Sequence, residues 1–234
     1  MESLLIDERF NGPDGIANGG YLAGRLAPLV DGVPEVTLRR GTPLGRELRV
    51  KRVADGVDLY DGDTMLVTAR ASSLEVEPPE PVSLEEARAA ARAFPRHADH
   101  PVPHCYVCGT ERAAGDGLRI LPGPVPGRET IYAAPWIPDA SVVDARGIVR
   151  DEHHWGALDC IGGFAVNEPP RGLALLGRIA AKIHRPVRLG EPLIVIGWPI
   201  AIEGKKLHAG TATYSAAGEL CAIARALWIL TPSP

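Results

Sequence analysis

The chain has 234 residues, of which 45% are hydrophobic and 23% charged, with a net charge of −4 at pH 7. This length and apolar content are enough to bury a sizeable core, and the negative charge argues against a nucleic acid partner. The acidic start MESLLIDERF lacks the basic flank and long apolar core of a signal peptide, and no apolar run reaches membrane-spanning length. We therefore expect a globular, cytoplasmic protein that makes no contact with a membrane.

In chain order, the first half is predicted to form a short strand, a glycine-rich helix over NGGYLAGRLAPLV (18–30), and then several strands. A proline-bracketed connector over 77–104 follows. Within it, Ser83 and Glu86 have the spacing of a capping box, and the alanine-rich run continues to Phe94, which predicts a helix.

The second half repeats this order. A glycine-rich helix is expected in HHWGALDCIGGFAV (153–166), followed by segments that are rich in Val, Ile, Thr and aromatic residues and separated by EGK and AAGE turns. They predict an antiparallel meander. These four segments are 175–187, 191–203, 205–216 and 219–230.

Three pairs of sequence blocks recur in the same order in the two halves, which indicates an internal repeat. RRGTPLGRELRV aligns with HRPVRLGEPLIV without a gap, so that Arg40 matches Arg185 and Gly45 matches Gly190. The paired blocks are 18–30 with 154–166, 39–50 with 184–195, and 67–76 with 222–231.

One helix on a curled antiparallel sheet, present twice in one chain, resembles the tandem (double) hotdog-fold acyl-CoA thioesterases. ANGGYLAGRLA (17–27) resembles the N-terminal helix of that family, and CYVCGTERAAGDGLRI (105–120) resembles the cysteine-glycine segment that precedes many thioesterase-like hotdog domains. The resemblance implies an α+β double hotdog. Its expected units are an N-terminal repeat over 1–76, a linker with one helix over 77–104, and a C-terminal repeat over 105–234.

Asp159 is the one carboxylate within 153–166, and the repeat aligns it with Ala23, so the position does not require an acid for folding. If it lies in the first turns of a helix that begins near Gly156, the positive helix end favours its ionised form. We expect Asp159 to act as a general base for water or as a nucleophile that forms a mixed anhydride, with local capping as the alternative.

Thioester hydrolysis also needs donors for the developing oxyanion. The N–H groups of Gly156 and Ala157 are the expected donors, because small residues let a thioester approach the backbone. His154 is expected to support Asp159 or, in a dehydratase, to act with it as an acid–base pair; a satisfied capping histidine is the alternative.

Substrate contacts are expected from both halves. Asn18 could hydrogen-bond a substrate carbonyl. Arg40 and Arg185, which the repeat aligns, could hold coenzyme A phosphates; the alternative is that they are solvated charges at a strand edge. Apolar helix residues such as Tyr21 and Phe164 could line an acyl tunnel or form plain core. The expected substrate-binding residues are Asn18, Gly19, Gly20, Tyr21, Arg40, Arg185 and Phe164.

The segment HCYVCG contains a C-x-x-C-G knuckle, Cys105 to Gly109, which binds zinc when a second ligand pair is nearby. His100 and His104 are close in sequence, but Cys160 and Cys221 fall on other predicted core elements. We therefore expect a tight turn lined by two buried thiols, and neither a metal nor any other cofactor.

The function expected from the resemblance is hydrolysis of an acyl-CoA-type thioester by a monomer or homodimer. The alternatives are a hotdog hydratase or dehydratase, a non-catalytic acyl-CoA-binding module, and a zinc-stabilised binding protein.

Overall fold

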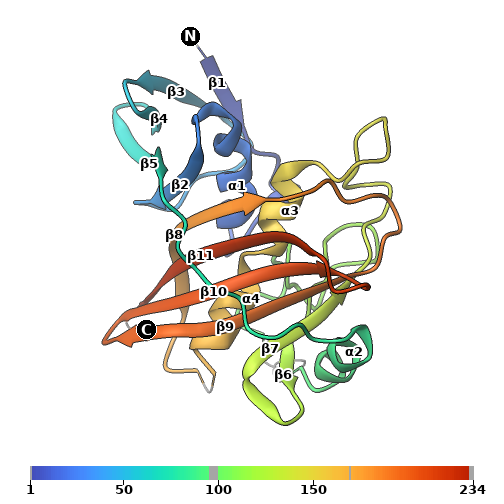
Figure 1. The fold of residues 1–234 in the computed structure, drawn as a ribbon. Coiled ribbons are helices and arrows are strands. Elements are labelled where there is room, and N and C mark those ends of the chain that lie inside the picture. The colour runs from blue at the N-terminus through green and yellow to red at the C-terminus, as the bar shows by residue number, and fades with distance from the viewer. Residues whose placement is uncertain (1, 95–99, 169, 232–234) are drawn as a thin grey trace.

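A computed structural model describes residues 2–94, 100–168 and 170–231, so part of the expected linker, residues 95–99, lies outside the described residues. The strands form one eleven-stranded sheet in the order β1-β3-β4-β5-β2-β8-β11-β10-β9-β7-β6 (Figure 1). Neighbouring strands are antiparallel throughout. The large antiparallel sheet with few helices agrees with a hotdog-type α+β fold.

The N-terminal part of the sheet, β1 to β5, has the spatial order β1-β3-β4-β5-β2, and a helix joins its first two strands. Its elements are β1 (Glu2–Leu5), η1 (Glu8–Phe10), α1 (Gly19–Leu26), η2 (Ala27–Leu29), β2 (Val33–Leu38), β3 (Glu47–Val53), β4 (Gly56–Asp61) and β5 (Thr64–Ser72).

The C-terminal part, β6 to β11, has the same order among β7-β9-β10-β11-β8, with β6 added at the outer edge. The four strands expected after the glycine-rich helix are confirmed as β8 to β11, but only β9, β10 and β11 form a meander, because β8 pairs with β11 and not with β9. The elements are α2 (Leu84–Arg92), β6 (Gly123–Val125), β7 (Arg128–Trp136), α3 (Asp151–Ala157), α4 (Cys160–Val166), β8 (Ala174–Ile183), β9 (Leu193–Glu203), β10 (Lys206–Ser215) and β11 (Leu220–Leu230).

The two parts meet where β2 pairs with β8, through Glu35 with Ala180, Val36 with Ile179, and Thr37 with Arg178. Val36 and Ile179 are both fully buried, so the core continues across this junction. The short pairing makes one continuous sheet out of the two groups of strands.

The turns before β3 and β9 have matching geometry at the positions that the sequence aligns. Gly45 and Gly190 both have positive φ, 69° and 75°, a conformation that favours glycine. The Gly45 N–H donates to the carbonyl of Ile6, just after β1, at 2.9 Å, and the Gly190 N–H donates to that of Pro138, just after β7, at 2.8 Å. Each turn is therefore tied to the segment that directly follows the matching strand of its own part, β1 or β7.

Helix α2 confirms the helix expected in the connector, with both hydrogen bonds of the Ser83–Glu86 capping box present. Its buried alanines, Ala87 and Ala90, pack with β7 and β9 residues such as Ile131 and Ile194. Neighbouring residues of β7 and β9 belong to a second, larger cluster that includes α1, α3 and α4. Because side chains alternate along a strand, α2 covers the face of the sheet opposite to these three helices.

The helix expected over 153–166 is instead two short helices, α3 and α4, separated by Leu158 and Asp159. Helix α3 begins earlier than expected because Asp151 and Glu152 occupy its first turn, where acidic side chains are favoured. Asp159 is thus the N-cap of α4, whereas its aligned partner Ala23 lies inside α1. The expected helix start near Gly156 is therefore wrong: Gly156 lies near the end of α3, and Asp159 directly precedes the first turn of α4, which begins at Cys160.

Helices α1 and α3 cross closely at two glycines of α1. A Cβ on Gly20 would lie 2.6 Å from Asp159 Cβ and 2.7 Å from the carbonyl oxygen of Trp155, and a Cβ on Gly24 would lie 2.5 Å from Glu152 Cα. These glycines therefore let the start of α1 touch the break between α3 and α4.

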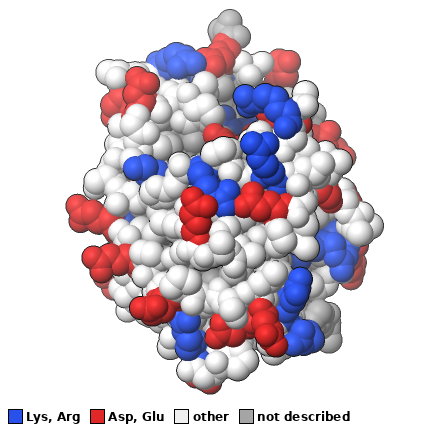
Figure 2. All heavy atoms as spheres, turned by 45° about the vertical axis from the view of Figure 1, so that its right-hand side comes forward, with Lys and Arg blue, Asp and Glu red and all other residues white. Residues whose placement is uncertain are grey.

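On the face seen in Figure 2, basic and acidic side chains are interspersed. Within the described part of the chain, no helix combines the length and apolar character needed to cross a membrane.

Candidate active site

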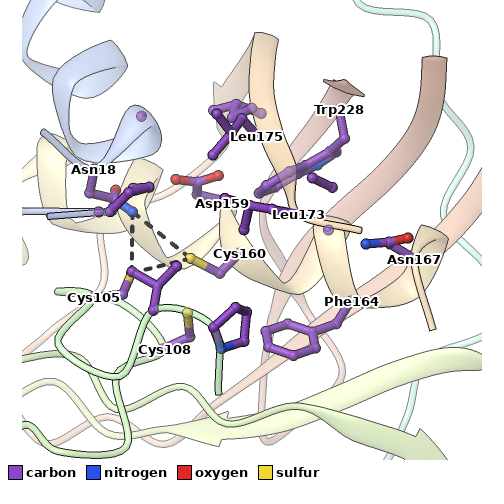
Figure 3. A pocket seen from close by; sticks show the side chains of 18 of the residues that line it. Asn18, Cys105, Cys108, Asp159, Cys160, Phe164, Asn167, Leu173, Leu175 and Trp228 are labelled. Carbon is purple, nitrogen blue, oxygen red and sulfur yellow. Dashed lines mark hydrogen bonds between the residues drawn. The ribbon is translucent and has the colours of Figure 1, made fainter. Parts of the chain in front are cut away.

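A cavity of about 250 Å³ lies between the start of α1, helix α4, β8, the end of β11 and the loop around residues 100–108 (Figure 3). Its wall is mainly apolar on the β8 side. The lining residues that matter for its chemistry are Asn18, Gly19, Cys105, Cys108, Asp159, Cys160, Phe164, Leu173, Leu175, Leu176 and Trp228.

Asp159 lies on the wall of this cavity with only 2% of its surface exposed. Its Oδ2 accepts a hydrogen bond from the Gly20 N–H at 2.8 Å, across the helix crossing. Its Oδ1 is buried and has no hydrogen-bond partner among the described residues. One carboxylate oxygen is therefore held in place, while the other is unsatisfied.

Burial raises the pKa of Asp159 to about 7, with the Gly20 N–H and the Asn18 side chain acting in the opposite direction. Near neutral pH such a group accepts and releases a proton readily, as a general acid or base must. A strongly shifted carboxylate on a cavity wall is a typical mark of a functional site.

Trp228, near the end of β11, contributes a second unsatisfied polar group. Its indole Nε1 is buried without a hydrogen-bond partner among the described residues, and its ring packs against Gly162 and Gly163 of α4. Two residues of the cavity wall thus carry an unpaired polar atom, the acceptor of Asp159 and the donor of Trp228. Trp228 was not predicted from the sequence, because it resembles any other aromatic residue of a buried strand.

Asn18 is the N-cap of α1 and is buried on the cavity wall. Its Oδ1 accepts the Tyr21 N–H at 2.9 Å. Its Nδ2 lies 3.8 Å from Cys105 Sγ and 3.9 Å from Cys160 Sγ and donates to both. Asn18 therefore both caps α1 and contacts two thiols.

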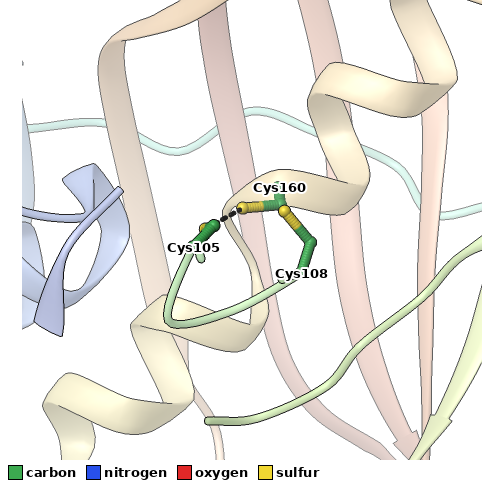
Figure 4. Close-up of side chains that lie close together, drawn as sticks. All are labelled: Cys105, Cys108 and Cys160. Carbon is green, nitrogen blue, oxygen red and sulfur yellow. Dashed lines mark hydrogen bonds between the residues drawn. The ribbon is translucent and has the colours of Figure 1, made fainter. Parts of the chain in front are cut away.

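Three buried cysteines meet beside Asn18 (Figure 3), and Figure 4 shows the three cysteines alone. The sulfurs of Cys105 and Cys160 are 3.7 Å apart, and those of Cys105, Cys108 and Cys160 all lie within 4.8 Å of one another. Hydrogen bonds from the Cys108 and Cys160 thiols hold the pKa of Cys105 well below its ordinary value. The sequence had placed Cys160 on a separate core element, but the fold brings it to the C-x-x-C-G turn.

Of the other expected substrate residues, Gly19 and Phe164 line the cavity, whereas Gly20 reaches the site through its N–H. Tyr21 is buried, with its ring stacked on Phe10 at a centroid distance of 4.0 Å, and is not among the residues that line the cavity. Tyr21 thus belongs to the core between α1 and α3.

The structure places the other expected catalytic groups away from the cavity. Gly156 and Ala157 are the last residues of α3, so their N–H groups are not the free donors of a helix start. His154 is buried in the core, where its Nε2 lies 2.7 Å from Thr213 Oγ1, and burial lowers its pKa to about 4. These positions argue against the roles that the sequence suggested for them.

The two arginines proposed for phosphate contacts differ from one another. Arg40 is exposed. Arg185 forms ion pairs with Glu191 at 2.5 Å and Glu219 at 3.0 Å, so its charge is already compensated. Among the described residues around the cavity, neither contributes to the wall.

Three solved structures illustrate what this fold resembles. A candidate thioesterase from Novosphingobium aromaticivorans has 12% identity and a TM-score of 0.62, over 98% of this chain and 95% of that one. A TesB protein from Mycobacterium avium subs paratuberculosis has 14% identity and a TM-score of 0.61, over 98% and 92%. A thioesterase superfamily protein matches over only 55% of this chain and 61% of its own length, with 20% identity and a TM-score of 0.48.

No family model matches the sequence. No curated protein matches it either. The full-length matches to two thioesterase-named structures confirm, at the level of the fold, the resemblance predicted from the sequence.

Proposed function

We propose, starting from the fold that it shares with thioesterases, that this protein hydrolyses an acyl-CoA-type thioester with Asp159 as the catalytic carboxylate. The observation that carries the proposal is the buried carboxylate on the cavity wall, with Oδ2 fixed by the Gly20 N–H and Oδ1 unpaired. Because burial already disfavours an ion here, keeping an acid at this position requires a functional reason.

In the proposed reaction, Asp159 Oδ1 removes a proton from water while the water oxygen attacks the thioester carbonyl carbon. The tetrahedral oxyanion then collapses, the C–S bond breaks, and the thiolate leaves. The proton held by Asp159 passes to the sulfur, which gives a free acid and a free thiol. The same carboxylate could instead attack directly and form a mixed anhydride that water cleaves.

Donors for the oxyanion are proposed from α1 and β11 in place of Gly156 and Ala157. The Gly19 N–H is the first of α1 and has no acceptor inside the helix, and Gly19 lines the cavity. The unpaired indole N–H of Trp228 is the second candidate. Both groups would be fixed before substrate binds, which is the condition for strong oxyanion stabilisation.

The acyl group is proposed to lie against the apolar wall formed by Phe164, Leu173, Leu175 and Leu176. A volume of about 250 Å³ lies below the usual range of drug-sized sites, about 300–1,000 Å³, so the bulk of a coenzyme A carrier would remain outside. A short or medium acyl chain therefore suits the cavity best.

We also infer that the two groups of strands are two hotdog units within the boundaries expected from the sequence, 1–76 and 105–234, joined by the linker over 77–104. The shared strand order and the matching turns at Gly45 and Gly190 support this inference. Each chain would then carry one catalytic carboxylate, Asp159, and the protein would act as a monomer or homodimer.

The test is a mass-spectrometric assay of short to long acyl-CoAs with wild type, Asp159→Asn and a control, Asp63→Asn, at an exposed turn residue. We expect free acid and coenzyme A from wild type and the control, and a loss of about 10²-fold or more in Asp159→Asn. No hydrolysis of any acyl-CoA, or equal rates in Asp159→Asn, would overturn the proposal. Gain or loss of one water on an intact thioester would identify a hydratase or dehydratase.

A further inference from the structure

We propose that Cys105, Cys108 and Cys160 bind one zinc-type divalent ion on the wall of the cavity. The inference is separate from the thioesterase proposal, because it concerns what the protein contains before any substrate arrives.

The spacing of the sulfurs carries the proposal. Zinc bound to thiolates is tetrahedral with Zn–S of about 2.3 Å, so two ligand sulfurs are about 3.8 Å apart. The sulfurs of Cys105 and Cys160 are 3.7 Å apart, and all three sulfurs lie within 4.8 Å of one another. An ion of this size can therefore be coordinated with small adjustments of side chains.

The backbone fixes the two sulfurs of the C-x-x-C-G turn. The Gly109 N–H donates to the carbonyl of Cys105 at 2.9 Å, and a Cβ at Gly109 would lie 2.4 Å from that oxygen. Two backbone hydrogen bonds tie the turn to neighbouring segments: the Tyr106 N–H donates to the carbonyl of Asn11, and the Ile120 N–H donates to the carbonyl of Val107. A ligand pair held in this way loses little conformational freedom when a metal binds.

The third sulfur comes from the first residue of α4, on the far side of the turn (Figure 4). Buried thiols pack as small apolar groups, so packing alone does not require three of them to meet at one point. Coordination stabilises such a cluster further, because it replaces three weakly bonded thiols by thiolates whose charge the ion largely compensates. Each thiol proton is released to solvent as the ion binds.

The Asn18 amide supplies the outer contacts that such a site needs. Its Nδ2 donates to two of the three sulfurs, and its Oδ1 is fixed by the Tyr21 N–H. Donors of this kind orient metal-bound thiolates. Asn18 would be a positioning residue for the metal site, in addition to its capping of α1.

The fourth ligand is proposed to be a water molecule from the cavity. Within the described residues, no histidine or carboxylate joins the three sulfurs at their mutual spacing. All three cysteines line the cavity, so water has access to the open position. Three protein ligands and one water is the arrangement of zinc sites that keep an exchangeable position.

The experiment is metal analysis of the full chain, purified under reducing conditions, incubated with zinc sulfate and freed of unbound ion by gel filtration. We expect about one zinc per chain in wild type. Cys105→Ser, Cys108→Ser and Cys160→Ser should each lower zinc affinity by about 10-fold or more. The matched control is Cys221→Ser, which changes the buried cysteine outside the cluster and should retain the metal.

A second measurement needs no variant, in case a serine substitution prevents folding. Cobalt(II) added to the reduced wild-type protein should give thiolate-to-metal charge-transfer bands and the strong visible bands of a tetrahedral site. Absence of both zinc and the cobalt bands in the reduced protein would overturn the proposal. It would also be overturned if Cys160→Ser kept as much zinc as Cys221→Ser, or if thiol counting under reducing conditions still found a disulfide within the cluster.

Neither outcome depends on catalysis. A protein that binds zinc but hydrolyses no thioester would refute only the proposed function, and an active protein without zinc would refute only the metal site.

Discussion

The N-terminal and C-terminal parts of the sheet have the same strand order but differ in the helical segment between two of their strands, β1 and β2 in one part and β7 and β8 in the other. In the N-terminal part α1 runs without interruption through Ala23, whereas in the C-terminal part Leu158 and Asp159 separate α3 from α4. The break places a carboxylate at the cavity, and α1 supplies the N–H that holds it. The difference teaches that a shared sheet can carry unequal helices, one that provides the acid and one that positions it.

Removing the acid would make the C-terminal part resemble the N-terminal part, and this change should have the largest effect. Asp159→Ala should reduce thioester hydrolysis about 10²- to 10⁴-fold, because it removes the proposed base. The midpoint of thermal unfolding should not fall, since the variant no longer buries a carboxyl group with an unpaired oxygen. Loss of folding together with activity would instead assign Asp159 a structural role.

Acid should destabilise the protein through the C-terminal part, because residues 1–76 contain no histidine. Burial lowers the pKa of His153 to about 3 and that of His154 to about 4, so both are neutral in the folded state. In the unfolded chain histidine takes up a proton below about pH 6.5. This contribution to stability is therefore complete above pH 6.5 and is lost as pH falls toward 4, by about 1.4 kcal/mol per pH unit for each histidine.

Urea unfolding at several pH values between 7.5 and 4.5 measures the net slope, to which the raised pKa of Asp159 contributes about 1.4 kcal/mol per pH unit in the opposite direction below pH 7. His154→Gln should make the slope shallower by about 1.4 kcal/mol per pH unit. An unchanged slope in this variant would contradict a neutral, buried His154.

At the crossing of α1 with α3, Gly24 has no room for a larger side chain, whereas Gly156 does. Gly24→Ala should lower the free energy of unfolding by about 1–3 kcal/mol, because its Cβ would lie 2.5 Å from Glu152 Cα. Gly156→Ala is the matched control within α3: its Cβ would meet side-chain atoms no closer than 3.5 Å, so higher helix propensity should raise stability by up to about 1 kcal/mol. Equal effects from chemical denaturation would show that the crossing is not close.

The turns before β3 and β9 should respond to the same substitution with the same small loss of stability. Gly45→Ala and Gly190→Ala each place a side chain at positive φ, which costs about 1–2 kcal/mol. The two losses should agree within about 0.5 kcal/mol, and asparagine at either position should restore most of the stability. Clearly unequal losses in denaturant midpoints would argue against equivalent turns.

Local patterns were sufficient for much of this fold. The capping box of α2, the strands β8 to β11 and the turns at EGK and AAGE follow from spacing and composition, and the one carboxylate of an apolar segment indicated Asp159, which lies on the cavity wall. The pairing of β8 with β11 instead of β9 did not follow from these local patterns. The helix break was missed because α3 is set by Asp151 and Glu152, ahead of the glycine-rich segment used to locate the helix. No strand was predicted from the sequence at the position of β7.

The site itself was less predictable, since its groups are distant in sequence. Cys160 reaches Cys105 across 55 residues, and Gly20 reaches Asp159 across 139. The role proposed for Trp228 rests on an unpaired N–H, which depends on what the fold leaves beside the indole ring. His154 looked available beside the acid, but the helix turns it toward Thr213.

The hydrogen bond between Gly20 and Asp159 has a consequence for how such a site can change over time. In a symmetric dimer of identical units, every substitution occurs twice, so a residue that improves one side of the interface is imposed on the other. Here the donor and the acid belong to one polypeptide and to different positions in it, so each can be altered alone. If the chain consists of two linked units, as proposed above, the helix around Ala23 need not resemble its counterpart and is available for a second specialisation.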